Sequence, residues 1–304
     1  MCRARRLAIA LLLVALVIQA YSIDAAADVV NLDEFAVARN GTTIFDDSYN
    51  RNTTLNGGSG TSLPSGTTFS DGTAANYVVR GSIPETTANN GQAQLNTANG
   101  IIAQPAGFPP LQEVFGILQT GTDPAGTHAL TPASTFSVIG LFDLAVPSVV
   151  LGTYDVFLVN GSPASPGRNI QMRVRLTDTG PVLQFIWVDQ ANNQTTVISQ
   201  MALTSAELAN PQLELGLSHD STSSDVVTAL YAFGSGNTSA TFNGTLTAFG
   251  STGGSTDLFT PTLNFAQPSF EMFDPVPEPS SLAILAVALL GLSTFRWRAR
   301  TSRL

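Results

Sequence analysis

The sequence predicts an all-β protein folded as a two-sheet antiparallel sandwich of the jelly-roll type. Apolar residues recur at every second position through most of the chain, as they do in strands with one buried face. Pairs that favour tight turns, such as Asn40-Gly41, interrupt these stretches at short intervals. Helical periodicity is nearly absent, and many short strands joined by turns favour two packed sheets over a helical or mixed fold.

The first expected hairpin shows this pattern. Phe35 and Val37 alternate with smaller residues, Asn40-Gly41 follows, and the chain returns through Ile44. Both central positions of a type I′ turn need positive φ, which asparagine and glycine adopt readily. Further strands with the same alternation are expected at 92–98, 136–144, 154–158, 171–177, 183–188, 213–217 and 241–249.

Three other segments complete the expected fold. Val226 to Phe233 is apolar nearly throughout, which predicts a strand buried on both faces. Thr204 and Glu207 form a capping-box pattern, which predicts the one short helix, ending before Pro211. The stretches 56–73 and 250–257 are rich in glycine, serine and threonine, so we expect loops there.

The first 27 residues have the three parts of a secretory signal peptide. Arginines stand at positions 3, 5 and 6, an apolar stretch runs from Leu7 to Ile18, and Ala25 and Ala27 form an A-x-A cleavage site. The mature chain would then begin at Asp28. Cys2 is the single cysteine and lies in the part removed, which excludes disulfides, zinc–thiolate sites and cysteine nucleophiles from the mature chain.

The C-terminal region combines three features in a fixed order. The tripeptide Pro277-Glu278-Pro279 is held extended, because proline restricts both its own φ and its predecessor. The apolar stretch Leu282 to Phe295 predicts a short transmembrane helix, slightly under the usual ~20 residues. The basic residues Arg296, Arg298 and Arg300 follow, and the positive-inside rule places them in the cytoplasm.

This three-part order resembles the PEP-CTERM sorting signal of Gram-negative bacteria; an ordinary C-terminal membrane tail is the alternative. The resemblance implies that an exosortase, an integral-membrane cysteine transpeptidase, recognises the tripeptide and processes the exported protein. The chain would be anchored transiently in the inner membrane and then delivered to the cell surface or an exopolysaccharide matrix.

The expected organisation follows from these segments. Residues 1–27 form the signal peptide and 28–270 the secreted β-sandwich domain. Residues 271–281 form a linker with the tripeptide, 282–295 the membrane helix, and 296–304 a basic cytoplasmic tail.

The charge of the chain excludes several functions. All 13 basic residues are arginines, so lysine-based nucleophiles, Schiff bases and P-loops are excluded. Six of these arginines lie between residues 28 and 275, against twenty carboxylates, and the whole chain has a net charge of −9. So acidic a domain, without a basic cluster, is not expected to bind nucleic acid.

No known catalytic motif is present in the sequence. G-x-S-x-G and H-E-x-x-H do not occur, and no pair of acidic residues has the E-x-D-x-E spacing that places two carboxylates on one face of a strand. The adjacent pairs Asp33-Glu34 and Asp46-Asp47 would point to opposite faces of a strand, so we expect solvated strand ends there. We therefore expect a protein that is not an enzyme.

Part of the body also resembles secreted sandwiches of the concanavalin A/laminin-G-like superfamily. The resemblance rests on Phe45-Asp46-Asp47, the glycine-rich stretch after it, and the paired strands near 212–218 and 226–233. A different β-sandwich or a barrel is the alternative.

A few residues are candidates for binding. Tyr49 and Tyr77 flank the glycine-rich stretch, so we expect exposed rings on which a polysaccharide could stack. Trp187 alternates with apolar residues and is expected in the core. Asp220 and Asp225 enclose a hydroxyl-rich loop that could hold calcium, the one cofactor we consider; a plain polar connection is the alternative.

These observations favour a structural or adhesive role, without catalysis, at the cell surface or in the matrix. A calcium-assisted, lectin-like carbohydrate-binding module is the alternative. A secreted polysaccharide hydrolase has the least support, because no catalytic residues are visible.

Overall fold

A computed structural model describes most of the β-rich part of the chain. The described residues are 29–87, 91–96, 101–102, 111–121, 126–143, 153–160, 168–177, 180–189, 194–210, 212–223, 226–234, 244–250 and 265–275. The expected signal peptide and the expected membrane helix both lie outside these ranges.

The described strands form two layers. Sheet A has the strand order β5-β1-β8-β13-β14-β15, with β2 paired to β1. Its strands are β5 (Gln92–Asn96), β1 (Val29–Arg39), β2 (Thr42–Asp47), β8 (Phe136–Asp143), β13 (Gln212–His219), β14 (Val226–Phe233) and β15 (Gly244–Gly250).

Sheet B has the strand order β12-β11-β10-β9-β16-β7-β4, with β3 paired to β4 and β6 to β7. Its strands are β12 (Gln194–Ala202), β11 (Gly180–Asp189), β10 (Arg168–Thr177), β9 (Thr153–Asn160), β16 (Ala266–Pro275), β7 (Leu111–Leu118), β4 (Ala74–Thr86), β3 (Thr54–Thr68) and β6 (Ile101–Ile102).

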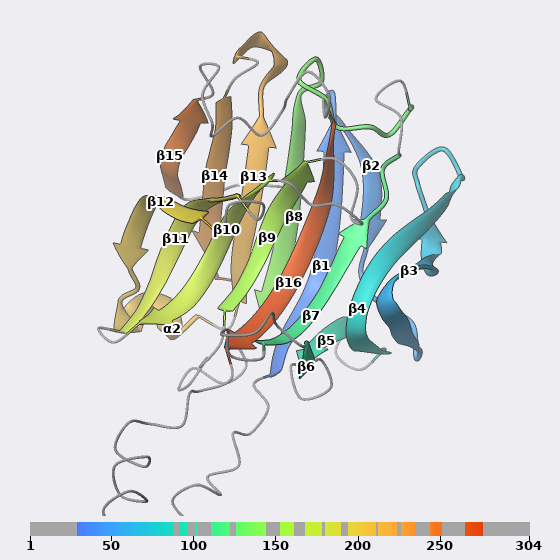
Figure 1. Cartoon of the computed structure of the whole chain (residues 1–304), viewed down its shortest axis with the longest axis horizontal. Coiled ribbons are helices and arrows are strands. Elements are labelled where there is room, and N and C mark those ends of the chain that lie inside the picture. Colours follow the sequence, from blue (N-terminus) through green and yellow to red (C-terminus); the bar gives the residue numbers. More distant parts are fainter. Residues whose placement is uncertain are drawn as a thin grey trace, which may run out of the picture. The chain divides into compact units, whose positions relative to one another are not determined.

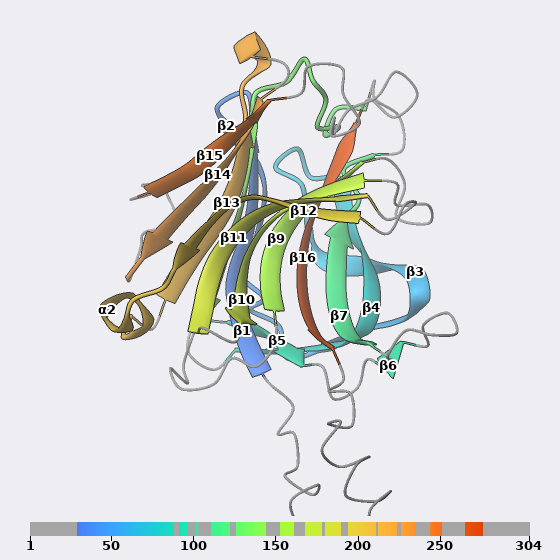
Figure 2. The ribbon, with the colours of Figure 1, turned by 60° about the vertical axis from the view of Figure 1, so that its left-hand side comes forward.

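Strand β4 belongs to both layers. Its residues Tyr77 to Arg80 pair with β7 in sheet B, and Glu85 and Thr86 pair with β5 in sheet A. The two sheets are therefore one continuous hydrogen-bonded surface that folds over the core, and Figure 2 shows the two layers from the side. This confirms the all-β antiparallel prediction.

The first hairpin forms as the sequence predicts. Asn40 and Gly41 have φ of 52° and 79°, the positive values of a type I′ turn. Val37 pairs with Phe45 on the returning strand, and both side chains are buried. The capping box of Thr204 and Glu207 also forms, although helix α2 spans only Ser205–Leu208.

Three expectations about these elements are wrong. The predicted loop 56–73 is largely strand β3, which pairs with β4 and accommodates its glycines through register shifts near Gly57 and Pro64. The domain does not end at residue 270, because β16 runs to Pro275 and covers the start of the predicted linker. Strand β14 is not buried on both faces: Val227 and Ala229 are in the core, but Thr228 and Leu230 between them are half-buried.

Aromatic rings fill the centre of the core. Phe270 of β16 makes edge-on contacts with Phe35, Tyr49 and Tyr77, at centroid distances of 5.0, 6.0 and 5.5 Å. Gly116 of β7 leaves room for this ring, since a Cβ there would lie 2.4 Å from it. Trp187 is also buried in the core, as expected. The last strand of the domain thus supplies the residue around which the core packs.

Candidate functional site

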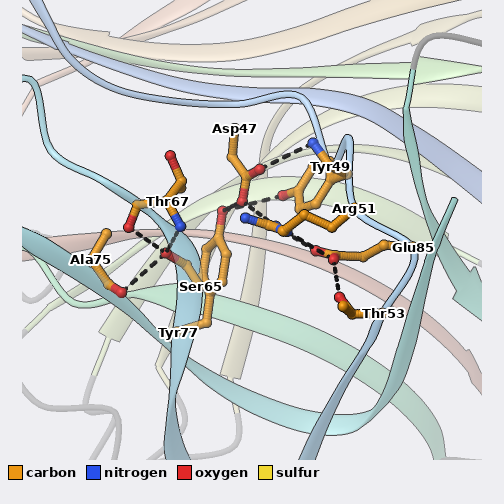
Figure 3. A network of polar contacts seen from close by, with 9 residues as sticks. All are labelled: Asp47, Tyr49, Arg51, Thr53, Ser65, Thr67, Ala75, Tyr77 and Glu85. Carbon is orange, nitrogen blue, oxygen red and sulfur yellow. Dashed lines mark hydrogen bonds and ion pairs between the residues drawn. The ribbon is translucent and has the colours of Figure 1, made fainter. Parts of the chain in front are cut away.

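The most extensive polar network of the described residues lies under the segment that joins β2 to β3 (Figure 3). Arg51 donates to Asp47 over 2.9 Å and makes a two-pronged contact with Glu85, through Nε at 2.8 Å and through Nη2. Thr53 donates to the same Glu85 carboxylate over 2.6 Å. Both carboxylates are almost fully buried, so Arg51 supplies the positive charge that they need.

Two tyrosines complete the network. The Tyr77 hydroxyl donates to Asp47 Oδ2 over 3.0 Å, and the Tyr49 hydroxyl lies 3.4 Å from that of Tyr77. Because the single hydroxyl proton of Tyr77 is used on Asp47, Tyr49 donates to Tyr77. Burial raises the pKa of Asp47, and the guanidinium of Arg51 partly offsets that rise. Since its groups satisfy one another, this network stabilises the fold and leaves little capacity for a ligand.

The expectation of exposed tyrosine rings is therefore wrong. Tyr49 and Tyr77 are both 0% exposed, and their rings pack on Phe270 in the core. Their hydroxyls can be buried because Asp47, expected to be solvated, is itself buried beside them. Neither ring can stack on a sugar in this conformation.

An open hollow of about 470 Å³ lies near the start of β2, whereas the polar network lies at its end. The hollow surrounds the end of β13. We call it the rim hollow, and the polar residues that line it are Thr135, Ser137, Ser218, His219, Asp220 and Thr228. It is rich in hydroxyl groups and open to solvent, so small polar ligands could enter it.

The expected calcium loop borders this hollow. Asp220 is exposed and accepts hydrogen bonds from the backbone N–H and hydroxyl of Thr222, both at 2.9 Å. These bonds form a local turn and lower the pKa of Asp220. Asp225 lies outside the described residues, so calcium binding by the pair stays a prediction. Among the described residues, no three His, Cys, Asp or Glu side chains converge as metal ligands.

The two histidines have structural surroundings. His219 is buried, with Nδ1 2.9 Å from the carbonyl of Ser134 and its ring 5.0 Å from that of Phe136. His128 stacks on Phe69 at 3.9 Å, and its Nε2 lies 3.0 Å from Asp71 Oδ2. The stacking of His128 depends on Phe69, far away in the sequence, so no local pattern predicts it.

Several carboxylates gather on the outward face of sheet A. Burial, with the nearby charges of Asp46, Glu214 and Asp33, raises the pKa of Glu34 to about 7. Between the ordinary pKa near 4.5 and this value, folded Glu34 keeps a proton that the unfolded chain has already lost. Raising the pH through this window therefore favours unfolding.

We expect the domain to lose stability as the pH rises from about 5 to about 8, and Glu34→Gln to reduce that loss. The measurement is the midpoint of urea unfolding at each pH. Asp71→Asn is the matched control. The pKa of Asp71 is lowered, so this side chain titrates below the pH window. A slope that is the same in Glu34→Gln and in the wild type would contradict the assignment.

The comparisons bear on the segment that follows β16. The fold and this segment define a class: an all-β domain followed by a C-terminal sorting signal. Residues 275–300 match the model of the PEP-CTERM protein-sorting motif, so the chain carries this motif, as the resemblance implied. No curated protein and no solved structure matches the chain, and the concanavalin A/laminin-G-like resemblance stays a prediction.

The sorting motif implies that the protein is exported and processed by an exosortase at a membrane-associated C-terminal signal. Pro277, Glu278, Pro279 and the arginines at 296, 298 and 300 all fall within the matched residues. These residues lie outside the described part of the chain, as do Ala25 and Ala27 of the expected cleavage site. Of the matched residues, the structure describes Pro275, the last residue of β16. In the part of the chain that is described, no helix is long and apolar enough to cross a membrane.

Proposed function

We propose that this protein is a structural or adhesive component of the bacterial cell surface or exopolysaccharide matrix, and that it is not an enzyme. The observation that carries the proposal is the PEP-CTERM motif, which begins where the last strand of the β domain ends. This arrangement delivers a self-contained β domain to the outside of the cell. The ion-pair network of Asp47, Arg51 and Glu85 suits such a role, because it ties the end of β2 and the connection that follows it to β4.

A calcium-assisted, lectin-like module is the second candidate. The rim hollow supports it: an open space of about 470 Å³ lined by hydroxyl groups and by the carboxylate of Asp220. Carbohydrate sites on β scaffolds commonly use loops at one end of the sheets, and the hollow has such a position.

Both candidates are tested by sedimenting the processed protein with insoluble matrix from its own host. We expect the protein to sediment with the matrix, whereas serum albumin at the same concentration stays in solution. A lectin should be released by a calcium chelator or by soluble matrix polysaccharide, but a structural component should resist both. A protein that stays soluble with intact matrix would contradict both functions.

A further inference from the structure

Strand β12 forms the open end of sheet B. It is the first strand in the order β12-β11-β10-β9-β16-β7-β4, so one of its two edges has no neighbouring strand among the described residues. Figure 1 shows β12 at this end of the sheet, next to β11. The backbone N–H and C=O groups along the open edge are available to pair with another strand.

The sequence of β12 lacks the residues that usually protect an edge strand. Natural proteins block such edges with charged side chains, with proline, or by keeping the strand very short. Gln194–Ala202 is nine residues long and contains no charged residue, no proline and no glycine. Its threonines, Val197 and Ile198 are β-branched, which favours the extended conformation. The strand is therefore well formed, and its composition leaves the edge open to pairing.

The first half of β12 is exposed on both of its faces. Gln194, Thr195, Thr196 and Val197 are all exposed, although successive side chains of a strand point to opposite sides. Val197 is 46% exposed, and no other large apolar side chain in the described part of the chain is as exposed. A single exposed valine is ordinary on a protein surface, but this one stands on an unpaired edge, where a further strand would cover it.

The exposed half of β12 is also regular. Residues 194–197 pair in continuous register with residues 186–189 of β11. The register shifts only after Val197, where Ile198 is an extra residue that forms a β-bulge. A bulge bends its strand and interrupts regular pairing, so it limits the open edge to residues 194–197.

The other outlying strands of the described sheets are less suited to pairing. β2 contains Asp46 and Asp47, β3 contains Pro64 and several glycines, and β6 has only two residues. β15 ends sheet A and is uncharged, but it is shorter than β12, and it begins and ends with glycine, which weakens a strand. Among these strands, β12 is thus the one with a long and unprotected edge.

The charge of the protein favours a second copy as the partner at this edge. Between residues 28 and 275 the chain has six arginines against twenty carboxylates, so two copies repel each other over most of their surface. The neutral β12 is a place where two copies can approach without that repulsion. A strongly charged partner would find no opposite charge on β12, whereas a second β12 matches it in length, polarity and strand propensity.

We propose that residues 194–197 pair with the same residues of a second copy, antiparallel and about a two-fold axis at Thr196, so that sheet B continues from one molecule into the next. Thr196 then lies opposite its own copy, and Thr195 lies opposite Val197, which places β-branched side chains beside one another. Because the paired segment is short, the dimer is weak, with a micromolar to millimolar dissociation constant. The inference rests on the proposed structural role and names the way in which copies of the domain would connect.

The first test is analytical ultracentrifugation of the processed protein from micromolar to millimolar concentration, where we expect a reversible monomer–dimer equilibrium. Val197→Glu brings like charges together near the axis and should raise the dissociation constant about tenfold or more, whereas the neutral, β-branched Val197→Thr should change it much less. Since Val197 is exposed, both variants should melt close to the wild type. Thr43→Glu adds the same charge at an exposed position of β2 and should leave the dimer intact.

The second test introduces a single cysteine. Cys2, the one cysteine of the chain, lies in the expected signal peptide, so an introduced cysteine is the only thiol of the processed protein. Thr196→Cys places two thiols opposite each other at the axis, and an added oxidant should link the copies, because directly opposite Cβ atoms lie about 4.5–5.5 Å apart. Thr43→Cys, also exposed, should stay largely unlinked. Hydrogen exchange in residues 194–197 should slow as the protein concentration rises.

Three outcomes would overturn the proposal. A wild type that stays monomeric at millimolar concentration forms no such dimer, and if it still sediments with its matrix, the proposed function stands. A dimer that Val197→Glu does not weaken, and in which Thr43→Cys links as readily as Thr196→Cys, uses another surface. Exchange in residues 194–197 that slows only when matrix is added would show that a different partner covers the edge.

Discussion

Replacing Arg51 by methionine should lower the free energy of unfolding by about 3–5 kcal/mol, the usual cost of leaving buried charges without their partner. Arg51 is the cation that contacts both Asp47 and Glu85, whose side chains are 3% and 0% exposed. Without Arg51, the two buried carboxylates would have no positive charge beside them and would repel each other. For a domain of this size the melting temperature should fall by roughly 10 °C. Urea unfolding and calorimetry measure both quantities.

Two controls make this expectation specific. Arg175→Met removes an exposed arginine from β10 and should change stability by less than about 0.5 kcal/mol. The triple variant Arg51→Met, Asp47→Asn, Glu85→Gln removes the stranded charges and should recover part of the loss. Equal stability of Arg51→Met and wild type would show that the network does not stabilise the contact between the β2–β3 connection and β4.

The strands themselves could be predicted because the sequence pattern that specifies each strand lies within a few neighbouring residues. Alternating side chains and turn pairs such as Asn40-Gly41 depend on a few neighbouring residues, and these hairpins form as expected. The capping box of Thr204 and Glu207 is equally local. Such sequence patterns predict the same local structure in any fold that buries one face of a strand.

The errors concern residues whose surroundings come from distant parts of the chain. Composition placed the 56–73 stretch in a loop, but β4 offers it an edge with which to pair, and pairing outweighs the low strand propensity of glycine. Tyr49 and Tyr77 looked exposed because they flank that stretch. Their burial depends on Asp47, Arg51 and Phe270, which no local pattern connects to them.

The outward face of sheet B could be predicted only in part. Alternation along β10 already places Arg173 on the face opposite the core. That Asp155 and Glu271 stand beside it follows from strand order, since β16 inserts between β9 and β7 although it comes last in the chain. The sequence contains no signal for this insertion, because the strands are more than 100 residues apart.

The position of β16 also sets what the exosortase can remove. Only Val276 separates the end of β16 from Pro277-Glu278-Pro279, so the motif is joined to a central strand by one residue. Fully extended, the chain from Pro275 to Glu278 spans only about 10 Å. Cleavage upstream of Pro275 would remove part of the strand that carries Phe270, the centre of the aromatic core. We therefore expect processing to occur downstream of Pro275.

Replacing Glu278 by alanine should abolish processing and leave the full C-terminal segment on the protein in the inner membrane. The tripeptide would keep its extended backbone, since both prolines remain, but it would lose the carboxylate that distinguishes it. Intact-mass analysis and membrane fractionation in a host with an active exosortase measure the result. Asp274→Asn is the matched control, because it neutralises an acidic residue outside the tripeptide and should be processed normally. Wild-type protein that retains Leu282 to Leu304 in such a host would contradict the sorting role, whereas a released form that ends near Pro279 and melts as a single β domain would show that processing spares β16.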